Sequence, residues 1–198
     1  MIELKENSRE KPYLILRDLY KKALSNSQKN VEAISISSYD KEKNEVNSRF
    51  VNLKYIENDK WVFFTNYNSP KSKDFASHPQ ISAILFWNQI NIQIRIKANI
   101  EKLPSDKSDT HFLKRDLKKN ALAISSKQSF KAKSYDDIRA KYIEVLNSKN
   151  NHKRPDYWGG YSFTPYYFEF WEGHDLRLNK RDLYEKDGDI WNHSFLQP

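Results

Sequence analysis

Most side chains in this sequence that could do chemistry are cations and amides near the predicted ends of strands and helices. Arg49 and Lys54 bracket one expected strand, and Lys71 follows Pro70, which is expected to open a helix. Free backbone amides and the dipole at a helix start favour an anion. With Trp171 further along, these residue types suit one or more phosphates beside a flat aromatic ligand. Taken singly, each also fits a structural role, Arg49 in a surface ion pair and Trp171 in the core.

Arginine is scarce, with nine Arg against 25 Lys. A guanidinium offers a planar fork that matches phosphate or carboxylate, so each Arg is more informative than a Lys. Arg115 and Lys119 are four positions apart and would share one helix face if a helix continues that far. The Arg residues in patterned segments are Arg49, Arg115, Arg177 and Arg181.

Several common chemistries are excluded by composition and spacing. The chain has no cysteine and only four glycines, which rules out thiol chemistry and Gly-rich nucleotide loops of the GxGxxG or GxxxxGK[ST] type. No GxSxG motif is present for a serine nucleophile. The five histidines show no metal-binding spacing, so we expect no metal site.

The 198 residues are enough for one domain, and the charge is +8 at pH 7. This excess could serve nucleic acid, a membrane surface or an anionic small molecule. A nucleic-acid-binding module lacks a recognised motif here, and the Lys residues are spread rather than striped. Without a long apolar stretch or a signal-peptide pattern, we expect a soluble, cytoplasmic protein that does not bind membranes.

Hydrophobic periodicity predicts an α+β protein with an antiparallel, closed or nearly closed barrel. We expect helices over about 11–24, 70–77, 105–117, 121–129 and 134–146, and a polar linker over 149–155. We expect strands over 31–37, 49–56, 60–66, 81–87, 90–100, 166–171, 176–184 and 190–195, with turns at 39–47 and 57–59. Residues 1–198 form one predicted domain, with an N-terminal helix over about 11–25 and C-terminal strands over about 155–198.

The order of several short motifs is more specific than any of them alone. They are SRFVNLK (48–54), FFTN (63–66), SPK (69–71), Gln93 in an alternating strand, SKQS (126–129), WGG (158–160), EFWEGHDLRLNKR (169–181) and the terminal WNHSFLQP. This order resembles the pyridoxamine 5′-phosphate oxidase family over about residues 31–198. The resemblance implies an FMN-binding split-barrel homodimer with two flavins at the subunit interface. It also implies oxidation of pyridoxamine or pyridoxine 5′-phosphate to pyridoxal 5′-phosphate, with O2 as acceptor and H2O2 as product.

The resemblance carries the family's site residues onto this chain. The implied FMN contacts are Arg49, Phe50, Val51, Leu53, Lys54, Phe64, Thr65, Lys71, Gln93, Gln128, Ser129, Trp171 and Arg181. Lys54 and Arg115 would hold the substrate phosphate, and Arg177 would lie against the pyridine ring near the reacting carbon. Arg177 and Asn179 take the catalytic positions.

The chain departs from the family pattern at four positions. Pro70 replaces an Arg before the flavin-binding Lys71, and His111 and Lys119 replace a Tyr and a Ser in the phosphate-binding part. Asn179 replaces a His. His111 can still donate a hydrogen bond and Lys119 adds a positive charge, so both are candidate substrate contacts. A family flavoenzyme with another substrate, for example of the phenazine-pathway type, and a non-catalytic FMN or pyridoxal phosphate binder are the alternatives.

Overall fold

The computed structural model describes residues 1–148 and 152–198. Its strands are β1 (Glu3–Asn7), β2 (Ala33–Asp40), β3 (Glu45–Asn52), β4 (Tyr55–Asn58), β5 (Lys60–Asn66), β6 (Gln80–Trp87), β7 (Ile92–Lys102), β8 (Trp158–Glu172), β9 (Lys180–Asp187) and β10 (Ile190–Phe195). Its α-helices are α1 (Lys11–Ser25), α2 (Pro70–Ser77), α3 (Ser105–Lys114), α4 (Leu117–Ser125) and α5 (Tyr135–Asn147). The predicted α+β class is confirmed, and the strands pair antiparallel apart from β1, which pairs with β4 in parallel.

The strands form one sheet that curls round on itself. Neighbours pair in the order β1-β4-β5-β8-β7-β6-β2-β3, and β9 joins β8 and β10. β3 and β4 stand near opposite ends of this order, yet only Leu53 and Lys54 separate them in the chain. The backbone N–H of Leu53 donates to Glu32 on the β2 side, while that of Lys54 donates to Val62 of β5. This crossing closes the barrel and brings β3 close to β5.

Alternation of apolar and polar residues explains the barrel core. Along β7, Ile92, Ile94 and Ile96 are buried, and the residues between them are partly exposed. Because side chains of a strand alternate between its faces, one face of β7 is apolar. Aromatic rings from β5 and β8 fill much of the interior, with Trp61 and Phe163 fully buried.

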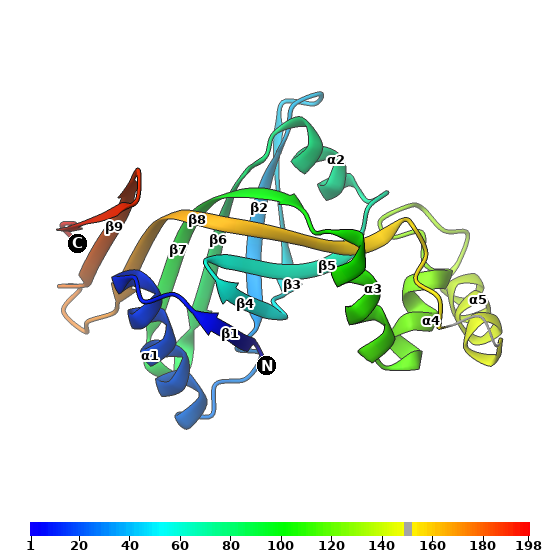
Figure 1. Ribbon diagram of the computed structural model, residues 1–198, viewed down its shortest axis with the longest axis horizontal. Helices are drawn as coiled ribbons and strands as arrows, with labels where there is room; N and C mark the ends of the chain where they lie inside the picture. The colour runs from blue at the N-terminus through cyan, green and yellow to red at the C-terminus, as the bar shows by residue number, and fades with distance from the viewer. Residues whose placement is uncertain (149–151) are drawn as a thin grey trace.

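Helix α1 packs one face on the barrel. Pro12 stands in the first turn, where its missing N–H costs nothing. Tyr13, Leu16, Tyr20 and Ala23 are spaced by three and four residues and are all buried. The helix is therefore held by tertiary packing of this stripe, and Figure 1 shows it beside the barrel near the N-terminus.

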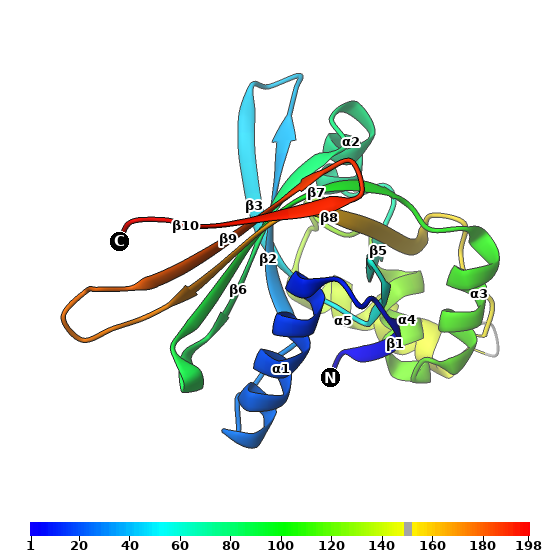
Figure 2. The same cartoon turned by 60° about the vertical axis from the view of Figure 1, so that its left-hand side comes forward.

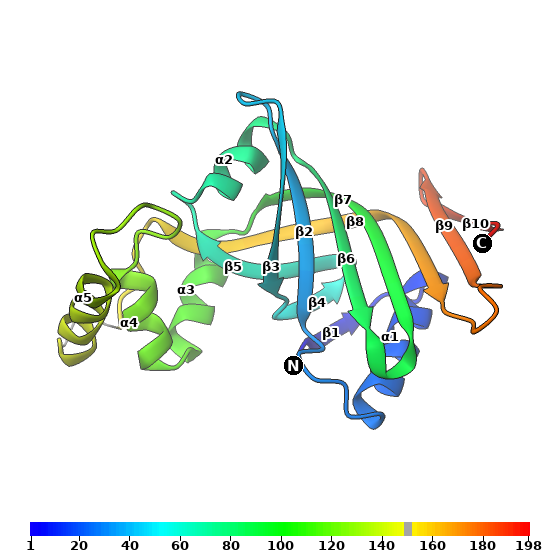
Figure 3. The same cartoon turned by 180° about the vertical axis from the view of Figure 1, so that it is seen from behind.

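Strand β8 runs the length of the molecule and connects its two ends. Helices α3, α4 and α5 gather at one end, and β9 and the C-terminus lie at the other, in both Figure 1 and Figure 3. On one edge β8 pairs with β7, and on the other it pairs first with β5 and then with β9. Figure 2 shows β9 beside β10, and the orange connection between β8 and β9 extends away from the barrel. No helix among the described residues is long and apolar enough to cross a membrane.

Three predicted elements are wrong in extent. The strand over 49–56 is two strands, since the chain changes partner at Leu53 and Lys54. The helix over 105–117 ends at Lys114, because Arg115 is extended and Asp116 caps α4 by accepting from the amides of Lys118 and Lys119. Arg115 and Lys119 therefore do not share a helix face. The strand over 176–184 begins only at Lys180.

Other boundaries shift by a few residues. The turn over 39–47 is shorter, because β2 and β3 pair as far as Asp40 and Glu45. The strand over 166–171 is the second part of the longer β8, and Ile90 ends a short 3₁₀ helix, η1 (Asn88–Ile90), before β7. The predicted helix over 121–129 begins and ends four residues earlier, as α4. Of the predicted linker 149–155, residues 149–151 lie outside the described residues.

Candidate active site

A cavity of about 420 Å³ lies between the barrel and the α3–α4 end of the molecule. This volume is typical of small-molecule sites. Most of the predicted site residues line it: Arg49, Phe50, Val51, Lys54, Phe64, Thr65, Lys71, His111, Arg115, Lys119, Gln128 and Ser129. Leu53 does not, because its side chain is fully buried in the core. Asn52, Pro70 and Trp158 also line the cavity but are not among the predicted site residues.

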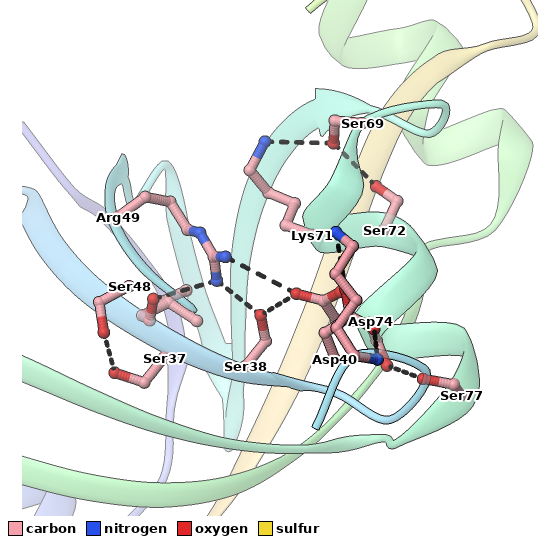
Figure 4. A network of polar contacts seen from close by, with 12 residues as sticks. Ser37, Ser38, Asp40, Ser48, Arg49, Ser69, Lys71, Ser72, Asp74 and Ser77 are labelled. Atoms are coloured by element: carbon pink, nitrogen blue, oxygen red, sulfur yellow. Dashed lines mark hydrogen bonds and ion pairs between the residues drawn. The ribbon is translucent and has the colours of Figure 1, made fainter. Parts of the chain in front are cut away.

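Arg49 is held in place by a polar network on the barrel wall. Its Nη1 donates to Ser38 Oγ at 2.7 Å, and its Nη2 lies 3.7 Å from Asp74 Oδ2. Ser38 Oγ in turn donates to the same carboxylate oxygen at 2.6 Å, as Figure 4 shows. Burial lowers the pKa of Arg49, and Asp74 opposes this effect. Asp74 therefore orients a guanidinium that lines the cavity.

Lys71 is a buried cation whose contacts are hydroxyl groups. Only 7% of its surface is exposed, and its Nζ donates to Thr65 Oγ1 and Ser69 Oγ, each at 3.2 Å. Burial and then the nearby Arg49 lower the pKa of Lys71 to about 8, against the opposing effect of Asp74. Within the described residues, no carboxylate forms an ion pair with it. An anion in the cavity would supply the compensation that the protein does not.

The loop after α4 is tied to β5 next to Lys71. Gln128 Oε1 accepts from Thr65 Oγ1 at 2.9 Å and from the backbone N–H of Asn66 at 3.2 Å. Ser129 follows with φ 68°, a left-handed conformation that a serine rarely adopts. Residues more than 60 positions apart thus meet at the wall where Arg49 and Lys71 lie.

A second group of cations lies in the same cavity. Lys54 comes from the β3–β4 crossing, Arg115 from the break between α3 and α4, and Lys119 from α4. Burial lowers the pKa of Lys54, and the neighbouring charges of Lys119 and Arg115 lower it further, while Glu32 opposes them. Burial also lowers the pKa of Arg115, against the effect of Asp116. We refer to Lys54, Arg115, Lys119 and the adjacent His111 as the cradle.

Aromatic rings pack against the Arg115 and His111 side chains of the cradle. The Arg115 guanidinium lies over the Trp158 ring, with Cζ 4.7 Å from the centroid, and its Nη1 donates to the Lys119 carbonyl at 2.9 Å. The Phe64 ring stacks on Trp158 and on His111, with 3.7 Å between the Phe64 and His111 centroids. Trp158 belongs to the WGG motif, which marked the segment but not its contact with Arg115.

The remaining predicted residues do not line this cavity. Gln93, Trp171 and Arg181 are direct neighbours on β7, β8 and β9. Glu169, 1% exposed, accepts from Arg181 Nε at 2.8 Å and pairs with Arg95 on its other side. Trp171 stands 13 positions beyond Trp158 on β8, or roughly 40 Å along a flat strand.

The loop before β9 holds the two residues predicted for catalysis. Arg177 has φ 60°, a left-handed backbone conformation. Asn179 Oδ1 accepts from the backbone N–H of His174 at 3.0 Å, which stabilises the loop. Within one subunit, the residues near β9 therefore lie at the opposite end of β8 from the residues around the cavity.

Solved structures with the same arrangement define the class of protein. PhzG from Burkholderia lata, described in complex with tetrahydrophenazine-1-carboxylic acid, matches with a TM-score of 0.90 and 25% identity over 96% of this chain and 93% of that one. A pyridoxamine 5′-phosphate oxidase-related, FMN binding protein from Nostoc punctiforme shares the fold, with a TM-score of 0.77 and 11% identity over 92% and 97% of the two chains. The fold is that of the FMN-binding split-barrel proteins.

Sequence comparison then defines the family. The family model described as pyridoxamine 5′-phosphate oxidase matches residues 21–149, and that described as pyridoxine 5′-phosphate oxidase C-terminal dimerisation region matches 158–198. A pyridoxine/pyridoxamine 5′-phosphate oxidase of Legionella pneumophila (strain Paris) is 34% identical over all of this chain and 93% of its own length. One of Thermosynechococcus vestitus is 36% identical over 76% of this chain and 72% of its own. The chain belongs to the pyridoxamine 5′-phosphate oxidase family, as the resemblance predicts, and is an oxidoreductase of that family.

Proposed function

We propose that this protein is an FMN-dependent oxidase that converts pyridoxamine or pyridoxine 5′-phosphate to pyridoxal 5′-phosphate, with O2 as acceptor and H2O2 as product. The observation that carries the proposal is the presence of two cation groups in one cavity. Arg49 and Lys71 form the first, and the cradle forms the second. FMN and the substrate each bring one phosphate, so each group has one anion to bind.

The first group suits the FMN phosphate. Arg49, fixed by Asp74, and the buried Lys71 would donate to its oxygens, with the Ser129 hydroxyl beside them. Thr65 and the β3 edge would contact the rest of the cofactor. When bound, FMN supplies the hydride-accepting chemistry. The protein's part is to hold substrate and cofactor together and to neutralise their phosphates.

The second group suits the substrate phosphate. Lys54, Arg115 and Lys119 offer three positive charges, and neutral His111 offers a hydrogen bond. Charge-assisted bonds are about twice as strong as neutral ones, so the cradle favours a dianion. Arg177 and Asn179 would lie against the pyridine ring, where Arg177 orients the substrate and Asn179 can donate a hydrogen bond but cannot transfer a proton.

We propose that the second subunit of a homodimer completes this site. Gln93, Trp171 and Arg181 lie side by side at the end of β8 that is far from the cavity. The match to the family's C-terminal dimerisation region includes Trp171 and Arg181. A partner subunit would bring these residues, with Arg177, to the flavin. The implied position of FMN between subunits agrees with this arrangement.

The homodimer is testable by sedimentation. Because residues of both subunits would bind one flavin, we expect a dimer in the FMN-loaded protein at low micromolar concentration. We also expect Trp171→Ala to lower flavin affinity in the dimer. A folded monomer that holds stoichiometric FMN at this concentration would contradict the proposal.

A different substrate is the second candidate, since PhzG shares the fold and its described ligand is a monocarboxylic acid. Three cations around one anion favour a phosphate over a single carboxylate, which is why we place this candidate second. The deciding experiment is turnover of pyridoxamine 5′-phosphate by the FMN-loaded protein with detection of peroxide. Absence of turnover with FMN bound would favour another substrate or a binding role.

Lys119 provides a matched test of the cradle. Lys119→Ser restores the hydroxyl of the family pattern and removes one charge. We expect KM for pyridoxamine 5′-phosphate to rise about three- to tenfold, as for the loss of one phosphate contact, with kcat almost unchanged because the contact persists in the transition state. Lys118→Ser, next to it but outside the cavity lining, is the control and should leave KM unchanged. Equal effects of the two variants would exclude Lys119 from the site.

A further inference from the structure

The His111 imidazole is held by ring stacking on one face and by a hydrogen bond at one edge. Its face stacks on Phe64 with an interplanar angle of 7°, and its Nδ1 lies 2.7 Å from the Tyr55 hydroxyl. The Tyr55 ring meets it edge-on at 89°. Tyr55 begins β4 just after the barrel crossing, and His111 belongs to α3. The ring therefore has little freedom to turn.

The two ring nitrogens face different spaces. His111 lines both the 420 Å³ cavity and a smaller one of about 160 Å³, whereas Tyr55 lines only the smaller one. Nδ1, next to Tyr55, thus faces the smaller cavity. Because the two nitrogens of an imidazole point away from each other, Nε2 is directed away from Tyr55, and the other cavity that His111 lines is the one that holds the cradle.

Burial and the neighbouring cations keep the His111 ring neutral. Burial lowers the pKa of His111 to about 4, and the cations Arg115, Lys54, Lys5 and Lys114 lower it in the same direction. The acidic groups nearby, Glu57 and Asp106, line the smaller cavity, where Glu57 is already paired with Lys107 at 2.9 Å. A neutral imidazole carries one N–H, so its tautomer decides whether it can donate to an anion in the cradle.

We propose that Tyr55 is a positioning residue for the substrate phosphate. Its hydroxyl donates to Nδ1 of His111 and so holds the tautomer whose Nε2–H points into the cradle. His111 then acts as an uncharged donor beside the three cations. This inference rests on the proposed function in that it takes the bound anion to be the substrate phosphate.

The kinetic test uses Tyr55→Phe, which keeps the ring and removes only the hydroxyl. We expect KM for pyridoxamine 5′-phosphate to rise about three- to tenfold, with kcat within about twofold and no change for unphosphorylated pyridoxamine. In a His111→Phe background, Tyr55→Phe should have no further effect on KM. Tyr39→Phe, which removes a hydrogen bond to Asn44 on an exposed turn, is the control. Additive effects of the two substitutions, or equal effects on both substrates, would overturn the proposal.

A spectroscopic test separates this inference from the proposed oxidase activity. In ¹⁵N NMR of the FMN-loaded protein, His111 should show a protonated Nε2 and a bare Nδ1 between about pH 5.5 and 8.5, and Tyr55→Phe should mix the tautomers. Added inorganic phosphate should shift the Nε2–H signal of the parent. A protonated Nδ1 in the parent, or no response of Nε2–H to phosphate, would overturn the role of Tyr55. Absence of turnover alone would contradict only the proposed activity.

Discussion

FMN affinity is expected to fall about ten- to a hundredfold when Lys71 is replaced by Met, because the variant loses a charge-assisted bond to the phosphate worth roughly 1.5–3 kcal/mol. Met keeps the aliphatic volume of the side chain. The FMN-free variant should be at least as stable as the parent, since among the described residues the buried ammonium has hydroxyl contacts and no ion pair. Flavin fluorescence titration and thermal unfolding measure the two effects.

Two further variants make this test specific. Lys73→Met, an exposed residue one position beyond the buried Ser72, should leave FMN affinity unchanged. Arg49→Ala should also weaken FMN by about ten- to a hundredfold, but it leaves the buried Asp74 without its guanidinium and should lower stability as well. Retention of stoichiometric FMN at nanomolar protein by both Lys71→Met and Arg49→Ala would place the phosphate elsewhere.

The lowered pKa of Lys71 adds a pH dependence to the same binding step. In the FMN-free protein Lys71 loses its proton near pH 8, and a bound phosphate dianion would raise that pKa. FMN binding therefore takes up a proton above about pH 8, and affinity should fall by up to about tenfold per pH unit above this value. Lys71→Arg should abolish this dependence between pH 7 and about 9. A flat affinity profile in the parent would contradict the assignment.

The same shift predicts how stability without FMN depends on pH. The pKa of Lys71 is lowered from 10.5 in the unfolded chain to about 8 in the fold. Between these values the unfolded chain binds more protons, so the contribution of this group to stability rises with pH across that window. Lys71→Met should remove the rise, and thermal unfolding at several pH values measures it.

Arg115→Ala is expected to raise KM for pyridoxamine 5′-phosphate about ten- to a hundredfold, through loss of a fork that binds phosphate oxygens. The same substitution should leave KM for unphosphorylated pyridoxamine almost unchanged. Arg115→Lys should recover only part of the loss, because an ammonium does not reproduce the planar contact with Trp158. Steady-state kinetics with both substrates measures these differences.

The control for this prediction is Arg139→Ala, an exposed arginine on α5. It changes net charge by the same amount, so it reveals any general electrostatic effect on substrate approach. Equal turnover of phosphorylated and unphosphorylated substrates by the parent protein would contradict the cradle as a phosphate site. So would an equal rise in KM for both substrates in Arg115→Ala.

Elements that depend on local pattern agree closely between sequence and structure. Helix α1 follows from its apolar spacing and Pro12, and α2 begins at Pro70 after Ser69. The hairpin between β4 and β5 turns within 57–59, and β10 covers the predicted residues 190–195. Each of these features is decided by residues within a few positions of one another, so a linear reading is sufficient.

Features that depend on contacts between distant residues could not be predicted from the local sequence pattern. The strand break at Leu53 follows from a change of sheet partner, and the placement of Arg115 over Trp158 joins two distant segments of the chain. Periodicity does not report such changes, because the apolar pattern continues across them. The contact of Tyr55 with His111 spans 56 positions and has no local signal.

The sequence by itself determined the family, the α+β class and the residue types that can bind two phosphates, because ordered motifs and local periodicity are properties of the linear chain. Only the tertiary structure decided which of these residues lie around the cavity and which lie at the other end of the molecule. Barrel closure brings Arg49, Lys71 and the cradle to one cavity, while the length of β8 keeps Trp171 and Arg181 at the other end. Spacing along a chain does not give distance in space once a sheet curls, since hydrogen-bonded strands bring remote positions to about 5 Å and one long strand keeps near ones apart.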